Sequence, residues 1–229
     1  MTSSLSALRR QSLEQAIGYH FRDSTLLQRA LTHRSASRAN NERLEFLGDS
    51  VINHIVAEAL FLKFPDADEG QLTRLRAILV RGEYLAGLAH GLELADALIL
   101  GAGERKSGGR QRRSILADAV EAIAGAMLID SEFATVRKVV LQWYHEGLDE
   151  ITLDAVKDPK TRLQEWLQAR GEELPSYDLV QVDGEDHRQS FTVTCQLAGR
   201  DLALTGRGSS RRRAEQAAAK ATLERLESD

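Results

Sequence analysis

Apolar residues recur every three or four positions through most of the first 150 residues, and this spacing is typical of amphipathic helices. Two stretches, residues 51–60 and 115–127, show the period most clearly. No strand-like alternation interrupts them, and Pro65 is the one proline before residue 150. We therefore predict that residues 1–150 form an all-α domain.

The pattern changes after a short linker at residues 151–157. Asp158 followed by Pro159 is typical of a helix start, because aspartate caps free backbone N–H groups and proline tolerates the first helical position. Period-two alternation at residues 191–197 then predicts a strand. Its core-facing side chains would be Phe191, Val193, Cys195 and Leu197, and the side chains facing away Thr192, Thr194 and Gln196.

Two more strands are predicted at residues 177–182 and 201–205, on either side of that strand. A last helix is predicted to begin near Ser209 or Ser210, since alanines recur there at helical spacing. Residues 158–229 are therefore predicted to form a small α+β domain with the element order α-β-β-β-α.

The composition of the chain mainly excludes classes of protein. The chain has 229 residues, of which 42% are hydrophobic and 28% charged, as in ordinary globular proteins. No apolar run approaches the ~20 residues of a membrane-spanning helix, and the first residues lack the apolar segment of a secretory signal. The single cysteine, Cys195, permits no internal disulfide, so we expect a cytoplasmic protein without a membrane partner.

The net charge of −4 by itself argues against nucleic-acid binding, since such domains usually carry a basic excess. Local clusters change this conclusion, because residues 105–113 (RKSGGRQRR) and 207–213 (RGSSRRR) contain no acidic side chain. Lys106 and Arg110 are candidates for phosphate binding. They lie in a predicted glycine-containing loop directly before a helix, where the backbone can approach an anion closely.

The predicted second domain offers a further set of polar groups. Hydroxyl and guanidinium groups at the start of its last helix fit phosphates across a groove: Ser209, Ser210, Arg211 and Arg212. Thr161 and Gln164, on the polar side of its first helix, are predicted to reach 2′-hydroxyl groups in an A-form minor groove. His187, in the predicted loop between the first two strands, is another candidate for contact with the minor groove. The remaining histidines singled out show no metal-ligand or triad spacing, and we predict structural roles for them: His33, His54, His90 and His145.

Acidic residues form two stripes on the predicted helices. Glu42, Glu45 and Asp49 recur at spacings of three and four, so they lie on one helix face. Asp118 and Glu121 repeat the spacing of three on a second, mostly apolar helix. Small residues beside them would let the first helix approach closely and bring the two stripes together.

Such a cluster of carboxylates needs a counter-charge, because like charges at short range raise one another's pKa. Mg²⁺ suits these hard oxygen donors, with Mn²⁺ as a substitute, and a divalent ion with open water positions can activate water against a phosphodiester. The alternative is that the acids lie on solvated helix faces. The apolar character of both helices disfavours that alternative.

These segments resemble the bacterial ribonuclease III family. NERLEFLGDS at residues 41–50 matches the family's signature, and SILADAVEA at residues 114–122 matches its second acidic segment. DEGQLTRLRA at residues 68–77 and KSGGR at residues 106–110 also resemble family segments. Residues 158–227, which close with GSSRRRAEQAAA, resemble a double-stranded RNA-binding domain.

The resemblance implies a Mg²⁺-dependent endoribonuclease that cuts both strands of duplex RNA and leaves 5′-phosphates and short 3′ overhangs. It further implies a homodimer whose two subunits form one valley with two active centres. Processing of ribosomal RNA precursors and of other structured transcripts, messenger and transfer RNA included, is the function expected from the family.

By motif position, the resemblance assigns the metal to Glu45, Asp118 and Glu121. Asp49 and Glu121 would orient or activate the attacking water, and Glu42 would shape the valley and assist RNA or a second ion.

Three further positions follow from the same resemblance. Phe46 stands where the family uses an aromatic side chain in the dimer contact, and Glu69 lies in a family-like segment with no role assigned. Glu215 is a departure, because many duplex-RNA-binding domains have lysine there; phosphate binding would then rest on Arg211 and Arg212.

Two other functions remain open at this point. One is a non-catalytic RNA-binding protein, which a metal-dependent cleavage assay on a long duplex would distinguish from a nuclease. The other is an all-α metal-dependent nucleotide hydrolase, whose activity would survive removal of residues 158–229.

Overall fold

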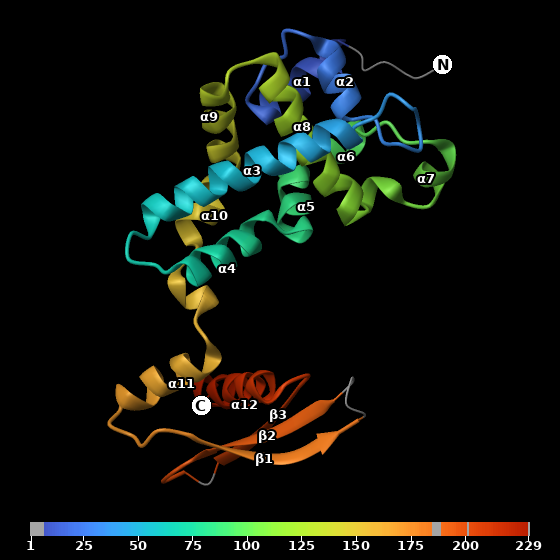
Figure 1. Ribbon diagram of the computed structural model, residues 1–229. Coiled ribbons are helices and arrows are strands. Elements are labelled where there is room, and N and C mark those ends of the chain that lie inside the picture. Colours follow the sequence, from blue (N-terminus) through green and yellow to red (C-terminus); the bar gives the residue numbers. More distant parts are fainter. Residues whose placement is uncertain (1–6, 185–188, 201, 229) are drawn as a thin grey trace. The chain divides into compact units, whose positions relative to one another are not determined.

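A computed structural model describes residues 7–184, 189–200 and 202–228, and the chain divides between Ile151 and Thr152 into two compact units (Figure 1). The predicted fold class is confirmed, because helices build the first unit and the second has the order α-β-β-β-α. Among the described residues, no helix combines the length and the apolarity that crossing a membrane requires.

The first unit is a helical assembly. Its elements are α1 (Ala7–Ile17), α2 (Ser24–Ala30), α3 (Glu42–Lys63), α4 (Glu69–Val80), α5 (Gly82–Gly91), α6 (Leu94–Ala97), α7 (Ala102–Lys106), the short 3-10 turn η1 (Gly109–Gln111), α8 (Arg113–Asp130), α9 (Phe133–Trp143) and α10 (His145–Glu150). Helix α8 lies at the centre, since 11 of its 18 residues are buried. Helix α3 is the long helix that runs across this unit in Figure 1.

Helices α3 and α8 approach so closely that side chains are excluded from their contact. A Cβ atom placed on Gly48 of α3 would lie 1.7 Å from the carbonyl oxygen of Glu121, and one on Gly125 of α8 would lie 2.1 Å from that of Leu44. Both distances are far below van der Waals contact, so only glycine fits at these two positions. The backbones of the two helices therefore meet at the level of the acidic residues.

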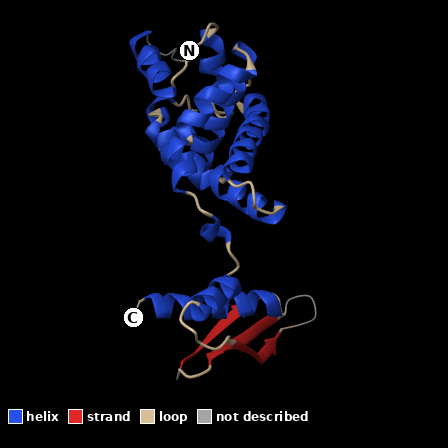
Figure 2. Ribbon diagram, turned by 90° about the vertical axis from the view of Figure 1, so that its left-hand side faces the viewer, coloured by secondary structure: helices blue, strands red, loops and turns tan. Residues whose placement is uncertain are grey.

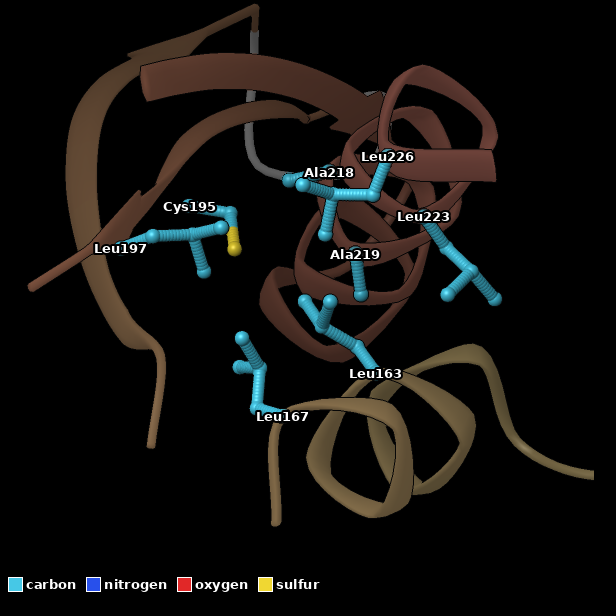
Figure 3. Close-up of a cluster of buried hydrophobic side chains, with 8 residues drawn as sticks. All are labelled: Leu163, Leu167, Cys195, Leu197, Ala218, Ala219, Leu223 and Leu226. Carbon is cyan, nitrogen blue, oxygen red and sulfur yellow. The ribbon is translucent and has the colours of Figure 1, made fainter. Parts of the chain in front are cut away.

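The second unit is a three-stranded antiparallel sheet covered on one face by two helices (Figure 2). Its elements are the short 3-10 turn η2 (Leu153–Val156), α11 (Pro159–Gln168), β1 (Ser176–Asp183), β2 (Ser190–Leu197), β3 (Leu202–Gly208) and α12 (Arg211–Glu227). The strands follow the order β1-β2-β3. Its core is drawn in Figure 3 and consists of Leu163, Leu167, Cys195, Leu197, Ala218, Ala219, Leu223 and Leu226.

Strand β3 continues beyond the predicted segment as far as Gly208. A Cβ atom on Gly206 would lie 2.1 Å from the backbone nitrogen of Ala218, so α12 lies directly on this part of the strand. Thr192 on β2 is only 7% exposed, although the alternation predicts that its side chain faces away from the core. Its cross-strand partners are Gln181 and Arg207.

We predict that Gly48→Ala lowers the free energy of unfolding by about 1–3 kcal/mol, because the added methyl group meets the α8 backbone. Gly87→Ala on α5 is the matched control, since nothing lies within 4 Å of its Cβ position. There the higher helix propensity of alanine should leave stability unchanged or raise it by about 0.5–1 kcal/mol. Chemical denaturation of both variants measures the difference, and equal stabilities would contradict the close contact.

Candidate functional site

Three of the five predicted acidic residues converge between α3 and α8. Glu45 extends from α3, and Asp118 and Glu121 extend from α8; one carboxylate oxygen of each lies within 4.8 Å of the other two. All three side chains are half-buried. The helical spacing within each stripe and the Gly48–Gly125 contact together explain this convergence.

Burial and mutual repulsion disfavour negative charge in this cluster. The pKa of Glu121 is raised to about 8, first by burial and then by the charges of Asp49, Asp118 and Glu45. Burial is also the main cause of the raised pKa values of Glu45 and Asp118. A divalent cation would compensate the repulsion, and three carboxylates within reach of one another are the hard oxygen donors that Mg²⁺ and Mn²⁺ prefer. The residues present therefore fit a metal ion.

The other two acids lie beside the cluster and are exposed. Asp49 accepts a hydrogen bond of 2.7 Å from the side-chain nitrogen of Asn53, which holds its carboxylate in place. The charge of Asp49 contributes to the raised pKa of Glu121, so the two carboxylates are close enough to repel each other. Glu42 accepts a hydrogen bond of 3.0 Å from the side chain of Asn40 and lies 3.6 Å from the Arg34 guanidinium.

Glu45 and Asp118 of this cluster line a cavity of about 580 Å³. Acidic and basic groups share its wall: Glu42, Glu45, Glu104, Asp118, His33, Arg34 and Arg112. Sequence reasoning missed His33 and Arg34 at this site. They precede the acidic helix in the turn after α2, and no spacing rule connects that turn with Asp118 on a distant helix.

The basic segment before α8 differs from the predicted open loop. It consists of the end of α7, a turn at Gly108 with φ of +79°, and η1. Three of its cations are engaged in ion pairs, because Arg110 pairs with Asp96, Arg112 with Glu104 and Arg113 with Glu83. Lys106 and Arg105 are exposed, and the described part of the chain supplies no ion-pair partner for either. Lys106 is thus more available to an anion than Arg110.

In the second unit the predicted contact residues gather where α11 and α12 begin. Asp158 and Gln216 connect the two helices through a hydrogen bond of 2.7 Å. Thr161 on α11 is exposed and Gln164 half-buried, while the residues at the start of α12 are all exposed: Ser209, Ser210, Arg211 and Arg212. Ser210 caps α12 by accepting a hydrogen bond from the Arg213 backbone N–H. His187 lies outside the described residues.

Glu215 is engaged with two cations of this surface. Its carboxylate lies 2.7 Å from the Lys160 ammonium and 3.0 Å from the Arg211 guanidinium. These hydrogen bonds, the one from Lys160 foremost, lower the pKa of Glu215. Arg212 lies farther from an acid, with the Asp158 carboxylate at 3.9 Å. The acid at this position therefore offsets positive charge on Arg211 and leaves Arg212 the freer of the two.

A carboxylate metal centre in a helical unit, followed by an α-β-β-β-α unit with cations at a helix start, is typical of metal-dependent nucleases of double-stranded RNA. Comparisons with known proteins agree. Residues 23–148 match a family described as ribonuclease-III-like, and residues 159–226 match the double-stranded RNA-binding motif.

Two solved structures of the nuclease domain of ribonuclease III from Campylobacter jejuni are similar to the first unit. One is 42% identical, with a TM-score of 0.58, over 59% of this chain and 96% of that domain. The other is 41% identical, with a TM-score of 0.59, over 62% of this chain and 97% of that domain. The chain therefore belongs to the ribonuclease III family, and it is an endoribonuclease of double-stranded RNA.

We predict that the stability of the metal-free protein falls as the pH rises from about 4.5 to about 8 because of Glu121. In that range the unfolded carboxyl group is ionised while the folded one holds its proton, so rising pH favours the unfolded state. Glu121→Gln removes this penalty. Its melting temperature in a metal chelator should exceed that of the wild type by a margin that grows up to about pH 8. Glu132→Gln, which alters an exposed acid, should show no such margin. A melting-temperature difference between Glu121→Gln and the wild type that does not change with pH would refute the raised pKa of Glu121.

We predict that Arg212→Ala weakens binding of duplex RNA about equally for unrelated sequences, because a phosphate contact carries no sequence information. The slope of log affinity against log salt concentration should become shallower by about 1. Fluorescence anisotropy across a salt series measures both quantities. Lys220→Ala, about two turns further along α12 at an exposed position, is the control, and an identical slope for both variants would exclude Arg212 from the interface.

Proposed function

We propose that the protein is a homodimeric, Mg²⁺-dependent ribonuclease III that hydrolyses phosphodiester bonds in both strands of duplex RNA and leaves 5′-phosphates and short 3′ overhangs. Mn²⁺ would serve as a substitute ion. The observation that carries this proposal is the convergence of Glu45, Asp118 and Glu121 at the edge of a cavity in a ribonuclease III fold. Their carboxylates would hold the ion.

When bound, the cation would polarise the phosphate and lower the pKa of water, so that the water could lose a proton and attack phosphorus near neutral pH. Asp49 would orient the attacking water and accept its proton. Its carboxylate is exposed, is held by Asn53, and is close enough to Glu121 to raise the pKa of that residue. Glu121, whose carboxylate would hold the ion, would also orient or activate that water. Glu42, at the cavity wall, would shape the substrate channel and assist RNA or a second ion.

The products follow from which bond breaks. Attack of water on phosphorus with departure of the 3′ oxygen leaves a 5′-phosphate and a 3′-hydroxyl group. Two centres related by a two-fold axis would cut the two strands at offset positions, which produces the overhangs. Lys106 and Arg110 would contact the RNA backbone near the nuclease centre, whereas the starts of α11 and α12 would bind the duplex through its minor groove and phosphates.

Two exposed phenylalanine side chains on α3 support the proposed dimer. Phe46 is 79% exposed and Phe61 is 65% exposed, and helical spacing places both on the same side of the helix. A hollow of about 600 Å³ lies beside Phe61 and is also lined by Leu72 and Glu69. One of the Campylobacter structures is described as flexible in the region involved in dimer formation of that nuclease domain.

Two copies related by a two-fold axis would use this face twice. Phe46 and Phe61 are 15 residues apart in the sequence, which is about 22 Å along a helix. If the two α3 helices ran antiparallel, Phe46 of each copy would lie over the hollow of the other, as an isologous interface requires. We therefore assign Phe46 to the dimer contact and Glu69 to its margin.

Ribosomal RNA precursors, with structured messenger and transfer RNA transcripts, are the proposed substrates, and the cytoplasm is the proposed compartment. This part of the proposal rests on family membership. The same membership favours a nuclease over the non-catalytic RNA-binding protein and the nucleotide hydrolase.

We predict that Glu121→Gln lowers the rate of duplex RNA cleavage in Mg²⁺ by at least about 100-fold, because an ion ligand and a group that orients the attacking water are lost together. Duplex affinity measured in Ca²⁺ should stay within about twofold of wild type, since the RNA-binding unit is unaltered. Glu132→Gln is the matched control and should cut at the wild-type rate. Undiminished cleavage by Glu121→Gln would refute the catalytic assignment.

We predict that Phe46→Ala weakens dimerisation by at least about 30-fold, the effect of losing an aromatic anchor in an interface. Sedimentation equilibrium of the free protein measures the dimer dissociation constant. Leu8→Ala is the control, because Leu8 is an 81% exposed apolar residue on α1, away from the α3 face. A monomeric wild type, or equal dissociation constants for both variants, would contradict the proposed interface.

A further inference from the structure

The turn that connects α2 to α3 is attached firmly to the segment before α7. The backbone N–H of His33 donates to the Ile99 carbonyl oxygen, and the Ile99 N–H donates to that of Leu31, at 3.0 and 2.9 Å. The Gly101 N–H donates to the Ser35 hydroxyl oxygen at 2.9 Å. A Cβ atom on Gly101 would lie 2.3 Å from the Ser35 carbonyl oxygen, so this contact also requires glycine. His33 is therefore held at a defined place.

The hydrogen bonds of the turn select one tautomer of the neutral His33 ring. The Ser35 backbone N–H points at Nδ1 of His33 from 3.2 Å, and the Ser35 hydroxyl group lies 2.8 Å from the same atom. Because a backbone N–H can only donate, Nδ1 must accept and carries no proton. The Ser35 oxygen already accepts from Gly101, so its own hydrogen is free to point at Nδ1 as well. The neutral ring therefore has its hydrogen on Nε2.

That Nε2–H group belongs to a side chain that lines the acidic cavity. His33 is half-buried in the wall that also contains Glu45 and Asp118. Within the described ranges, no protein group accepts a hydrogen bond from Nε2. A fixed donor thus lies beside the metal centre with its hydrogen-bonding capacity unused.

We propose that His33 contacts the substrate, with its Nε2–H donating a hydrogen bond to a non-bridging oxygen of the phosphate that is cut. This inference rests on the proposed function. Negative charge increases on those oxygens as water attacks phosphorus, and a donor already oriented toward them stabilises the transition state more than the ground state. The hydrogen bond transfers no proton and the ring forms no covalent bond. Arg34, from the same turn, brings positive charge to the same wall.

Two amide substitutions separate this role from a purely structural one. The side-chain NH₂ of glutamine can occupy the position of Nε2, whereas the amide of asparagine reaches only as far as Nδ1 and can keep the contact with Ser35. We expect His33→Asn to lower the single-turnover cleavage rate in saturating Mg²⁺ by about 10- to 100-fold. His33→Gln should retain most of the rate. A role confined to the turn predicts the opposite order.

Three further measurements make the result decisive. His145→Asn, at an exposed histidine paired with Asp149, should cut at the wild-type rate, and duplex affinity in Ca²⁺ should be unchanged in all variants. Nitrogen NMR of the unaltered chain should show the His33 proton on Nε2, a readout that requires no substitution. Wild-type rates in His33→Asn, the reverse order of the two variants, or a proton on Nδ1 would each overturn the inference while leaving the nuclease function intact. A wild-type chain that fails to cut duplex RNA would instead contradict the proposed function.

Discussion

The close contact between α3 and α8 is the constraint on which the nuclease site depends. Gly48 and Gly125 let the two helix backbones meet, and this contact determines how far apart the carboxylates of the two helices can be. A larger residue at either position would force the helices apart, because its Cβ atom would lie 1.7 or 2.1 Å from a backbone oxygen of the other helix. The ability of this cluster to hold a metal ion is therefore a consequence of packing as much as of the acidic residues themselves.

The same contact makes the site a local source of instability. Three half-buried carboxylates repel one another, and the raised pKa of Glu121 reports that cost. The surrounding helix compensates, because most of α8 is buried and apolar. A bound cation would change the balance, since it favours the ionised forms that burial disfavours. Function and stability are thus opposed at this site, as is common where catalysis needs clustered charge.

Charge is balanced differently on the RNA-binding surface. The chain is acidic overall, and Glu215 offsets Lys160 and Arg211 within the surface itself. Arg212 lies 3.9 Å from the Asp158 carboxylate, farther than Arg211 lies from Glu215, so its charge is less offset. The proposed binding of a polyanion would therefore depend on a few exposed side chains at the starts of two adjoining helices, and net charge is a poor guide to it.

Much of this protein could be read from its sequence, because the determining interactions are local. The three- and four-residue spacing of Glu45, Asp49, Asp118 and Glu121 follows from helix geometry, and the period-two pattern at residues 191–197 follows from the pleat of a strand. The family resemblance also depended on short continuous motifs. The tertiary structure alone decided which groups meet across the chain. The turn that is hydrogen-bonded to Ile99 places His33 in the same cavity wall as Asp118. Glu215 pairs with Lys160 across two helices, and the basic segment before α8 is partly neutralised by acids outside it. Such contacts join residues far apart in sequence, so no local period encodes them.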